Sequence, residues 1–406
     1  MTKPRQIIYP LGYARALIHR DPGSEENFKR NFGALLGGNI YVFPLGRARG
    51  GIFILVKLAI KKSRKRRVIL SPYTIPEVVH MVRFAGGDPV FVDVLQNSTN
   101  IDLDCLLRVM NKETACVLIT HYHVNQNQLA EIQDICRKRE VMLFDDCAVA
   151  LGADFMGIRV GRITDASIFS MSGLKPLNFF WGGAITTVSQ TLASDLSDAM
   201  EGWPRLKFVQ YSKQIIRTLR YDIATKRMPF SYIVFPILRK KHISSEVQNV
   251  TPLSRIESTF AKTIMSKPSL SATSEWNRKL AYADEYTRYR RFISAIYDKY
   301  FKNRSVSPET SDEIRSGSSY INYPIFVEPA RRDAVYKVIL SLGFDVGLSP
   351  YPNVHEVSGF TQIPGRTDNV SILVRSVIIL PTHPSISESY AHKLACAVKS
   401  VLQDTA

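Results

Sequence analysis

The sequence predicts an α/β protein with a mostly parallel central sheet, followed by a second, smaller α/β unit. Between residues 46 and 190, short apolar segments alternate with segments of helical spacing. In the segment 126–140, Leu129, Ile132 and Cys136 share one face of a helix. Alternation of this kind is typical of parallel sheets. The expected strands are 67–71, 89–93, 115–120, 141–145 and 166–171.

The alternation stops near residue 204 and resumes towards the C-terminus. Residues 204–250 are basic and aromatic, and Pro229 and Pro236 argue against one continuous helix there. Residues 270–300 predict a long polar helix, after which strand-like and helix-like segments alternate up to residue 402. We therefore expect a large domain over residues 1–250, with 204–250 as an insertion, and a small domain over 251–406.

The composition is that of an ordinary globular protein. Of 406 residues, 45% are hydrophobic and 22% are charged. No apolar run reaches the ~20 residues that a membrane span needs, and the first residues lead into no apolar signal segment. The five scattered cysteines are odd in number and never spaced as CxxC, which indicates free thiols and no zinc site. These features predict a cytoplasmic protein without a metal.

The net charge of +17 is compatible with nucleic acid, an anionic membrane or a phosphorylated substrate. The densest basic run, residues 61–67, fits a solvated helix C-terminus, and no nucleic-acid-binding motif accompanies it. We therefore expect no nucleic-acid partner. The 204–250 segment resembles an interfacial amphipathic patch. Packing on the body of the protein or on a second subunit is the favoured interpretation, and peripheral membrane contact is the alternative.

Polar residues at predicted strand ends deserve a chemical interpretation, because ligands bind at the carboxyl ends of parallel strands. A pyridoxal-phosphate (PLP) site needs a lysine that forms a Schiff base and a carboxylate that faces the pyridine nitrogen. It also needs hydroxyls and a helix N-terminus around the phosphate. The candidates for these parts are Gly46-Arg47-Ala48, His121, Asp145-Asp146, Ser170 and Lys175.

Spacing alone leaves other interpretations open. Lys175 taken by itself is equally compatible with a surface lysine. Asp145-Asp146 would also serve as a strand-end cap or as a magnesium site.

Several short motifs follow one another along the chain. Residues 89–93 read PVFVD and are followed by Asn100-Ile101-Asp102. Further elements are Asp145-Asp146-Cys147-Ala148, Gly157–Gly161, Asp165–Ser170 with Lys175, Gly182-Gly183-Ala184, Tyr351–His355 and Arg375–Pro384. From about Gly46 to Val401, the chain resembles the DegT/StrS family of PLP-dependent sugar aminotransferases.

The resemblance implies a type I PLP-dependent transferase fold, as in aspartate aminotransferase. It also implies a homodimer with active sites between the subunits. The implied reaction is amino transfer from glutamate or glutamine to a keto-sugar, nucleotide- or lipid-linked, in polysaccharide or secondary-metabolite biosynthesis.

The resemblance also implies residue roles. Lys175 would carry the cofactor and move protons, and Asp146 would pair with the pyridine nitrogen. Ser170 and the Gly46-Arg47 turn would bind the phosphate, whereas the role of His121 is less defined. The full set of implied cofactor-binding positions is Gly46, Arg47, Ala48, Ile75, His121, Asp146, Ser170 and Lys175.

Several positions depart from the family pattern. Ile75 stands where an aromatic side chain usually stacks on the ring, and Val149 stands where a glutamine usually supports the cofactor. Arg47, Val124 and Pro176 replace the usual threonine, glycine and asparagine. These changes keep two alternatives open, a different PLP reaction on an amino-acid substrate and a degenerate non-catalytic paralogue. Retention of Asp146 and Lys175 favours an enzyme.

Overall fold

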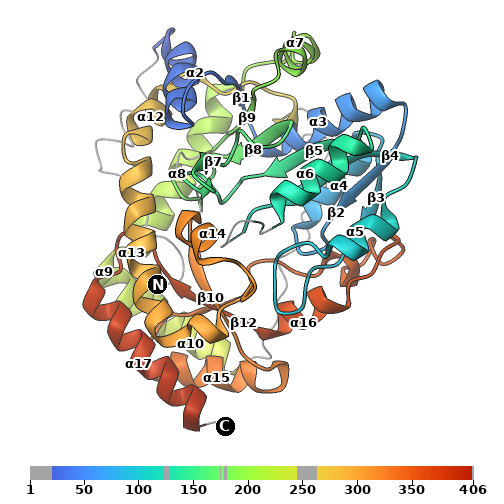
Figure 1. The fold of residues 1–406 in the computed structure, drawn as a ribbon. Helices are drawn as coiled ribbons and strands as arrows, with labels where there is room; N and C mark the ends of the chain where they lie inside the picture. Colours follow the sequence, from blue (N-terminus) through green and yellow to red (C-terminus); the bar gives the residue numbers. More distant parts are fainter. Residues whose placement is uncertain are drawn as a thin grey trace.

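A seven-stranded sheet forms the centre of the computed structural model, which describes residues 21–122, 126, 128–173, 175–177, 181–244 and 263–404 (Figure 1). The strand order is β1-β9-β8-β5-β4-β2-β3, and only β9 runs antiparallel to its neighbours. The strands are β1 Tyr41–Leu45, β2 Arg67–Leu70, β3 Asp88–Phe91, β4 Thr114–Thr120, β5 Met142–Asp146, β8 Ala166–Ser170 and β9 Gly183–Thr187. The five predicted strands are confirmed to within two residues, whereas β1 and β9 were not predicted.

Helices cover both faces of this sheet, as apolar strands buried on both sides require. One face packs against α3 Ala48–Ser63, α4 Pro76–Phe84 and α7 Gln190–Ala199. The other face packs against α2 Ser24–Leu35, α5 Leu103–Val109, α6 Leu129–Lys138 and α12 Leu270–Leu280. The helix predicted over 126–140 is α6, and its apolar face is buried as expected. The predicted parallel α/β layers are therefore confirmed.

A smaller unit lies below the main sheet in Figure 1. Its antiparallel sheet has the order β10-β12-β11, with β10 Asn322–Phe326, β11 Gly347–Leu348 and β12 Val377–Pro381. It packs against α13 Ala283–Phe301, α15 Pro329–Ser341 and α17 Glu388–Asp404. The connections contain β6 Asp154–Phe155, β7 Ile158–Arg159, η2 Lys302–Arg304, α14 Asp312–Gly317, η3 Val354–Glu356 and α16 Asp368–Ser376.

The predicted domain boundary between residues 250 and 251 lies outside the described residues. The two apolar cores show how the large and small units are connected. Ala283 at the start of α13 packs in the core of the large sheet, and Ile293 in the same helix packs in the core of the small unit. Helix α13 therefore belongs to both cores.

The basic segment folds as helices on the surface. Helix α8, Phe208–Ala224, ends before a second helical stretch made of α9 Arg227–Pro229, the π-helical turn η1 Phe230–Val234 and α10 Phe235–Ser244. Pro229 lies in the first turn of that stretch, where a missing N–H costs little, and Pro236 follows the wider π turn. The segment is thus not one continuous helix, as predicted, but the break lies at Thr225 and Lys226, and the stretch that contains both prolines stays helical. Within the described ranges, none of the helices has both the length and the apolar character that crossing a bilayer requires.

The prediction of one long polar helix over 270–300 is wrong. The chain forms α12 and α13 with a break at Ala281 and Tyr282, and the first half of α12 is buried. Trp276 is fully buried there and packs edge-on against Phe28 of α2, with ring centroids 5.0 Å apart. Burial of α12 against α2 overrides the polar composition of its sequence.

We expect Trp276→Ala to lower the free energy of unfolding by about 3–5 kcal/mol, because it removes a large side chain from a packed core. Chemical denaturation followed by circular dichroism measures the change. Phe292→Ala, at a position that is 46% exposed in α13, is the control and should cost less than about 1 kcal/mol. Equal losses for the two variants would contradict the assigned role of α12.

Candidate active site

The sheet register brings the two predicted phosphate-binding segments, the Gly46-Arg47-Ala48 turn and Ser170, to the start of β9. Gly183, the first residue of β9, pairs with Leu45 at the end of β1 and with Ser170 at the end of β8. The Gly46-Arg47-Ala48 turn follows Leu45 directly and leads into α3. A Cβ atom at Gly183 would lie 2.5 Å from Cα of Ala48, which is far inside contact distance. The absence of a side chain at this position therefore allows the first turn of α3 to lie against the sheet.

The N-terminus of α3 carries two arginines. Arg47 is the N-cap residue, and its guanidinium group lies 3.9 Å from the ring centroid of Trp181. Arg49 in the first turn forms an ion pair with Glu77 of α4 at 2.9 Å. Burial lowers the pKa of Arg47 to about 9, and the charge of Arg49 adds to this shift. A helix N-terminus with two neighbouring cations favours an anion such as phosphate.

Asp146 is the last residue of β5 and is buried. Side chains alternate along a strand, and Phe144 packs in the core beneath α3, so Asp146 points to the α3 face of the sheet. By the same reasoning Ser170 lies on this face, because Ile168 packs in the same core. Burial raises the pKa of Asp146, and the charge of Lys175 opposes this rise.

Lys175 lies in the loop after β8 and is partly exposed. Burial of its amino group lowers the pKa of Lys175, Asp146 opposes this shift, and Arg49 adds to it. The reciprocal influence of Lys175 and Asp146 means that the amine and the carboxylate lie near each other. Next to the lysine, the carbonyl oxygen of Pro176 accepts a hydrogen bond of 2.6 Å from the buried Arg290 of α13. The loop that presents the amine is thus held by a helix of the small unit.

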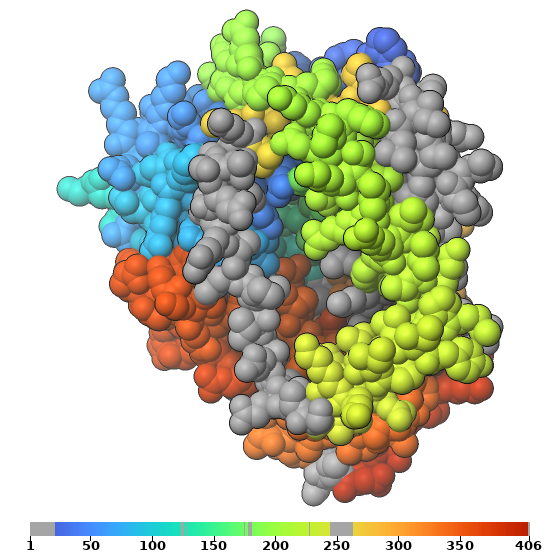
Figure 2. Space-filling model, turned by 180° about the vertical axis from the view of Figure 1, so that it is seen from behind, coloured from blue at the N-terminus to red at the C-terminus, as the bar shows by residue number. Residues whose placement is uncertain are grey.

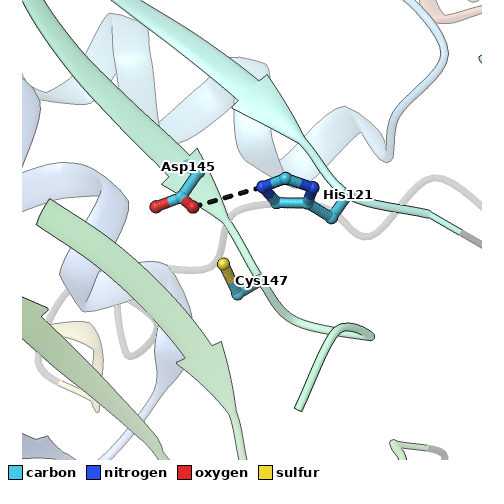
Figure 3. A group of neighbouring side chains, drawn as sticks. All are labelled: His121, Asp145 and Cys147. Atoms are coloured by element: carbon cyan, nitrogen blue, oxygen red, sulfur yellow. Dashed lines mark hydrogen bonds and ion pairs between the residues drawn. The ribbon is translucent and has the colours of Figure 1, made fainter. Parts of the chain in front are cut away.

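His121 contacts Asp145 through its side chain, as Figure 3 shows. His121 Nε2 and Asp145 Oδ2 are 3.2 Å apart, and neither side chain is exposed to solvent. The backbone N–H of Gln126 donates to His121 Nδ1 at 3.4 Å, so Nε2 carries the proton that Asp145 accepts. Burial acts to raise the pKa of Asp145, but hydrogen bonds from His121, Ser167 and Thr164 hold it below its usual value. His121 therefore orders the strand end behind the site.

Cys147 completes this cluster, and the three possible ligand atoms lie within 4.8 Å of one another. Burial, reinforced by Asp145, keeps the pKa of the Cys147 thiol well above its ordinary value. The histidine nitrogens are already engaged by Asp145 and Gln126. The arrangement is that of a protonated, hydrogen-bonded network inside the protein.

Three tyrosines that the sequence did not single out as site residues lie beside Asp146. The ring centroids of Tyr73, Tyr122 and Tyr351 are 4.9 to 5.3 Å apart. Burial and the charge of Asp146 raise the pKa of Tyr351, and the same two causes contribute for Tyr122. Tyr351 belongs to the C-terminal segment that resembles a family element. The cluster shows that this segment reaches the carboxyl edge of the large sheet.

The remaining predicted positions have simpler surroundings. Ile75 is the N-cap residue of α4 and packs, partly buried, against the core beneath α3 and α4. The carbonyl of Val149 accepts a hydrogen bond of 2.8 Å from Ser319 of the small unit. Val124 lies outside the described residues. Arg49, which the sequence analysis missed, was detectable only as a second arginine at the turn that is predicted to bind the phosphate.

Comparisons with known proteins agree with this geometry. Residues 19–212 match the model of the DegT/DnrJ/EryC1/StrS aminotransferase family. They make up just under half of the chain. A transaminase for UDP-4-amino-4,6-dideoxy-N-acetyl-beta-L-altrosamine from Campylobacter jejuni is 22% identical over 349 residues, which are 84% of this chain and 80% of the relative. The family resemblance predicted from the motifs is confirmed.

Solved structures of aminotransferases show the same fold. PseC from Helicobacter pylori, an aminotransferase involved in the biosynthesis of pseudoaminic acid, has a TM-score of 0.73 at 16% identity, covering 100% of this chain and 99% of that one. The sugar aminotransferase Spr1654 of Streptococcus pneumoniae, described as putative, is similar in its PLP form and its PMP form, with TM-scores of 0.71. The PLP form covers 100% of this chain and 99% of that chain, at 14% identity. The predicted type I fold is confirmed, and the predicted cofactor agrees with these relatives.

We expect Gly183→Ala to displace the first turn of α3, because its new Cβ would meet backbone atoms of Ala48 that cannot rotate away. A lower midpoint of thermal unfolding measures the cost. Gly33→Ala in α2 is the matched control, because its nearest neighbour would lie at an ordinary 3.5 Å and alanine favours a helix. A Gly183→Ala variant as stable as the parent protein would contradict the close approach of helix and sheet.

Proposed function

We propose that this chain is a PLP-dependent aminotransferase that moves an amino group from glutamate or glutamine to a keto-sugar. The observation that carries the proposal is that Lys175 and the buried Asp146 lie near enough for the charge of each to act on the pKa of the other, while a helix N-terminus with two arginines follows the adjoining end of β1. A PLP site needs this combination of amine, buried carboxylate and phosphate cradle. The family match supports the same reaction class.

The residues present fit the cofactor. The cradle of Gly183, Ser170 and the N–H groups at the start of α3 suits the phosphate, and Arg47 adds positive charge. Asp146, whose pKa is raised by burial, would hold the proton shared with the pyridine nitrogen. Lys175 would carry the cofactor covalently. His121 was predicted to contact the cofactor. We instead assign it a positioning role, because its side chain contacts Asp145 at the end of the strand that carries Asp146.

Bound PLP supplies the electron sink that stabilises negative charge at the substrate carbon. The chain's own task is then proton transfer, which falls to Lys175 Nζ. Burial lowers the pKa of this amine, which favours the neutral form that can accept a proton and return it at a neighbouring atom. The nearby Asp146 limits the shift, so that the amine can hold the proton between the two steps.

The substrate class rests on the relatives. One of them is a transaminase for a UDP-linked amino sugar, and another is a dTDP-4-dehydro-2,3,6-trideoxy-D-glucose 4-aminotransferase from Saccharopolyspora spinosa. We infer a nucleotide- or lipid-linked keto-sugar of polysaccharide or secondary-metabolite biosynthesis. Such relatives favour this reaction over another PLP reaction on an amino-acid substrate. The homodimer and the cytoplasmic location are further proposals, based on the family resemblance and the sequence composition.

We expect the loaded protein to absorb visible light and to lose this band when glutamate is added without an acceptor. Lys175→Ala should be colourless and should transfer no amino group, because the covalent attachment is gone. Absorption spectra and the release of 2-oxoglutarate measure both effects. Lys57→Ala, an exposed position in α3, is the control and should behave like the parent protein. A coloured and active Lys175→Ala variant would rule out the assignment.

The pH dependence of cofactor attachment gives a second test. Since burial lowers the pKa of Lys175 from 10.5, attachment should reach half its maximal rate at a pH below that value. Raising the pH removes the ammonium proton and should accelerate attachment up to a plateau. Asp146→Asn removes the charge that favours the protonated amine, so the profile should move to lower pH. Stopped-flow absorbance measures it, and a shift to higher pH in Asp146→Asn would contradict the pairing.

A further inference from the structure

Residues 204–244 form a charged and apolar surface that the proposed reaction does not use. The segment contains ten lysines and arginines and a single acidic residue, Asp222, which is buried. Figure 2 shows this segment in green and yellow-green, extending over the face of the molecule seen from behind. We call it the basic face.

Helix α8 presents apolar and basic side chains on the same side. With about 3.6 residues per turn, Val209, Ile216 and Ile223 fall on one stripe, because a seven-residue step drifts by only about 20°. These three are exposed by 62%, 46% and 48%. The exposed Lys213 and Arg220 lie on the same stripe. The opposite side, with Tyr211 and Ile215, packs in the core of the large sheet.

The second helical stretch continues this pattern. Four large apolar residues from α9 to α10 are at least 60% exposed, namely Met228, Tyr232, Ile233 and Ile237. The exposed basic residues Arg239, Lys240 and Lys241 follow them in α10. Phe235 on the inner side packs against the core of the small unit. Both helical stretches are thus anchored inward and present isoleucines and cations outward.

We propose that the basic face binds the surface of an anionic lipid bilayer. Exposed isoleucine, methionine and tyrosine side chains would enter the boundary between headgroups and acyl chains. Lysine and arginine side chains would extend past them to anionic headgroups. The positive charge of the segment favours an anionic partner, because ten basic residues and one acidic residue give it an excess of nine positive charges.

Other partners suit this surface less well. A twofold contact between two copies would bring the same patch onto itself, so the positive charges would repel each other. A nucleic acid would neutralise the cations but would leave the nine exposed large apolar residues of α8 to α10 without a partner. An anionic bilayer satisfies the cations and the apolar side chains together.

Sedimentation of the full-length, PLP-loaded protein with vesicles tests the proposal. The protein should co-sediment with vesicles of phosphatidylcholine and phosphatidylglycerol but not with vesicles of phosphatidylcholine alone. High salt should release the protein from the anionic vesicles. The variant Ile216→Glu/Tyr232→Glu/Ile237→Glu should bind at least roughly tenfold more weakly. Leu342→Glu, at a position that is 55% exposed after α15, is the matched control and should bind like the parent protein.

A second variant tests the proposal independently, in case the first variant misfolds. Arg217→Gln/Arg220→Gln keeps the apolar residues and should weaken binding to the anionic vesicles roughly twentyfold. Absence of binding to anionic vesicles overturns the proposal. So does retention of DNA without vesicle binding, or an unchanged affinity in both variants. If the glutamate variant instead converts a dimer into a monomer by light scattering, the surface is an interface between copies. Vesicle binding does not require amino transfer, so this test and that of Lys175 fail separately.

Discussion

The close approach between the first turn of α3 and the start of β9 is the constraint on which the candidate site depends. At Gly183 the sheet joins β1 to β8, and the same glycine leaves room for the backbone of Ala48. Because of this contact, the helix N-terminus faces the strand end that carries Ser170. The position of the anion-binding atoms therefore follows from backbone geometry, and the arginines add charge to a cradle that already exists.

Two adjacent carboxylates show how a strand separates two chemical roles. Asp145 and Asp146 point to opposite faces of the sheet because side chains alternate. Hydrogen bonds from His121, Ser167 and Thr164 outweigh the burial of Asp145 and lower its pKa. Burial dominates at Asp146 and raises its pKa, with Lys175 as the opposing charge. The pKa values of the two adjacent carboxyl groups are thus shifted in opposite directions, down at Asp145 and up at Asp146.

Much of the fold was predictable because hydrophobic periodicity reports burial directly. The buried strands β2, β3, β4, β5 and β8 were found, and α6 was found from one apolar stripe. Strand β1 was missed because only Val42, Pro44 and Leu45 of its residues are buried, and β9 was missed because its glycine looked like a loop motif. The buried, polar α12 could not be recognised from composition, because its burial depends on the packing of its Trp276 against Phe28 of α2.

Of the candidate site, the residues at strand ends were predictable, because topology places the ends of parallel strands at one edge. Asp146 and Ser170 are of this kind. Lys175 lies in the loop after β8 and was singled out by the family resemblance. The tyrosine cluster was not predictable, because Tyr73, Tyr122 and Tyr351 come from distant parts of the chain and meet only after the small unit docks. Arg49 was missed for a similar reason, since its partner Glu77 lies on another helix.

Helix α13 has a mechanical consequence for the reacting amine. Its first residue packs in the large core, its later residues pack in the small core, and Arg290 between them holds the carbonyl of Pro176 next to Lys175. Arg290 is buried, so its hydrogen bond is shielded from competition by water. Any rotation of the small unit is therefore transmitted to the lysine loop as a displacement. The orientation of the small unit and the position of the amine are therefore coupled through one buried hydrogen bond.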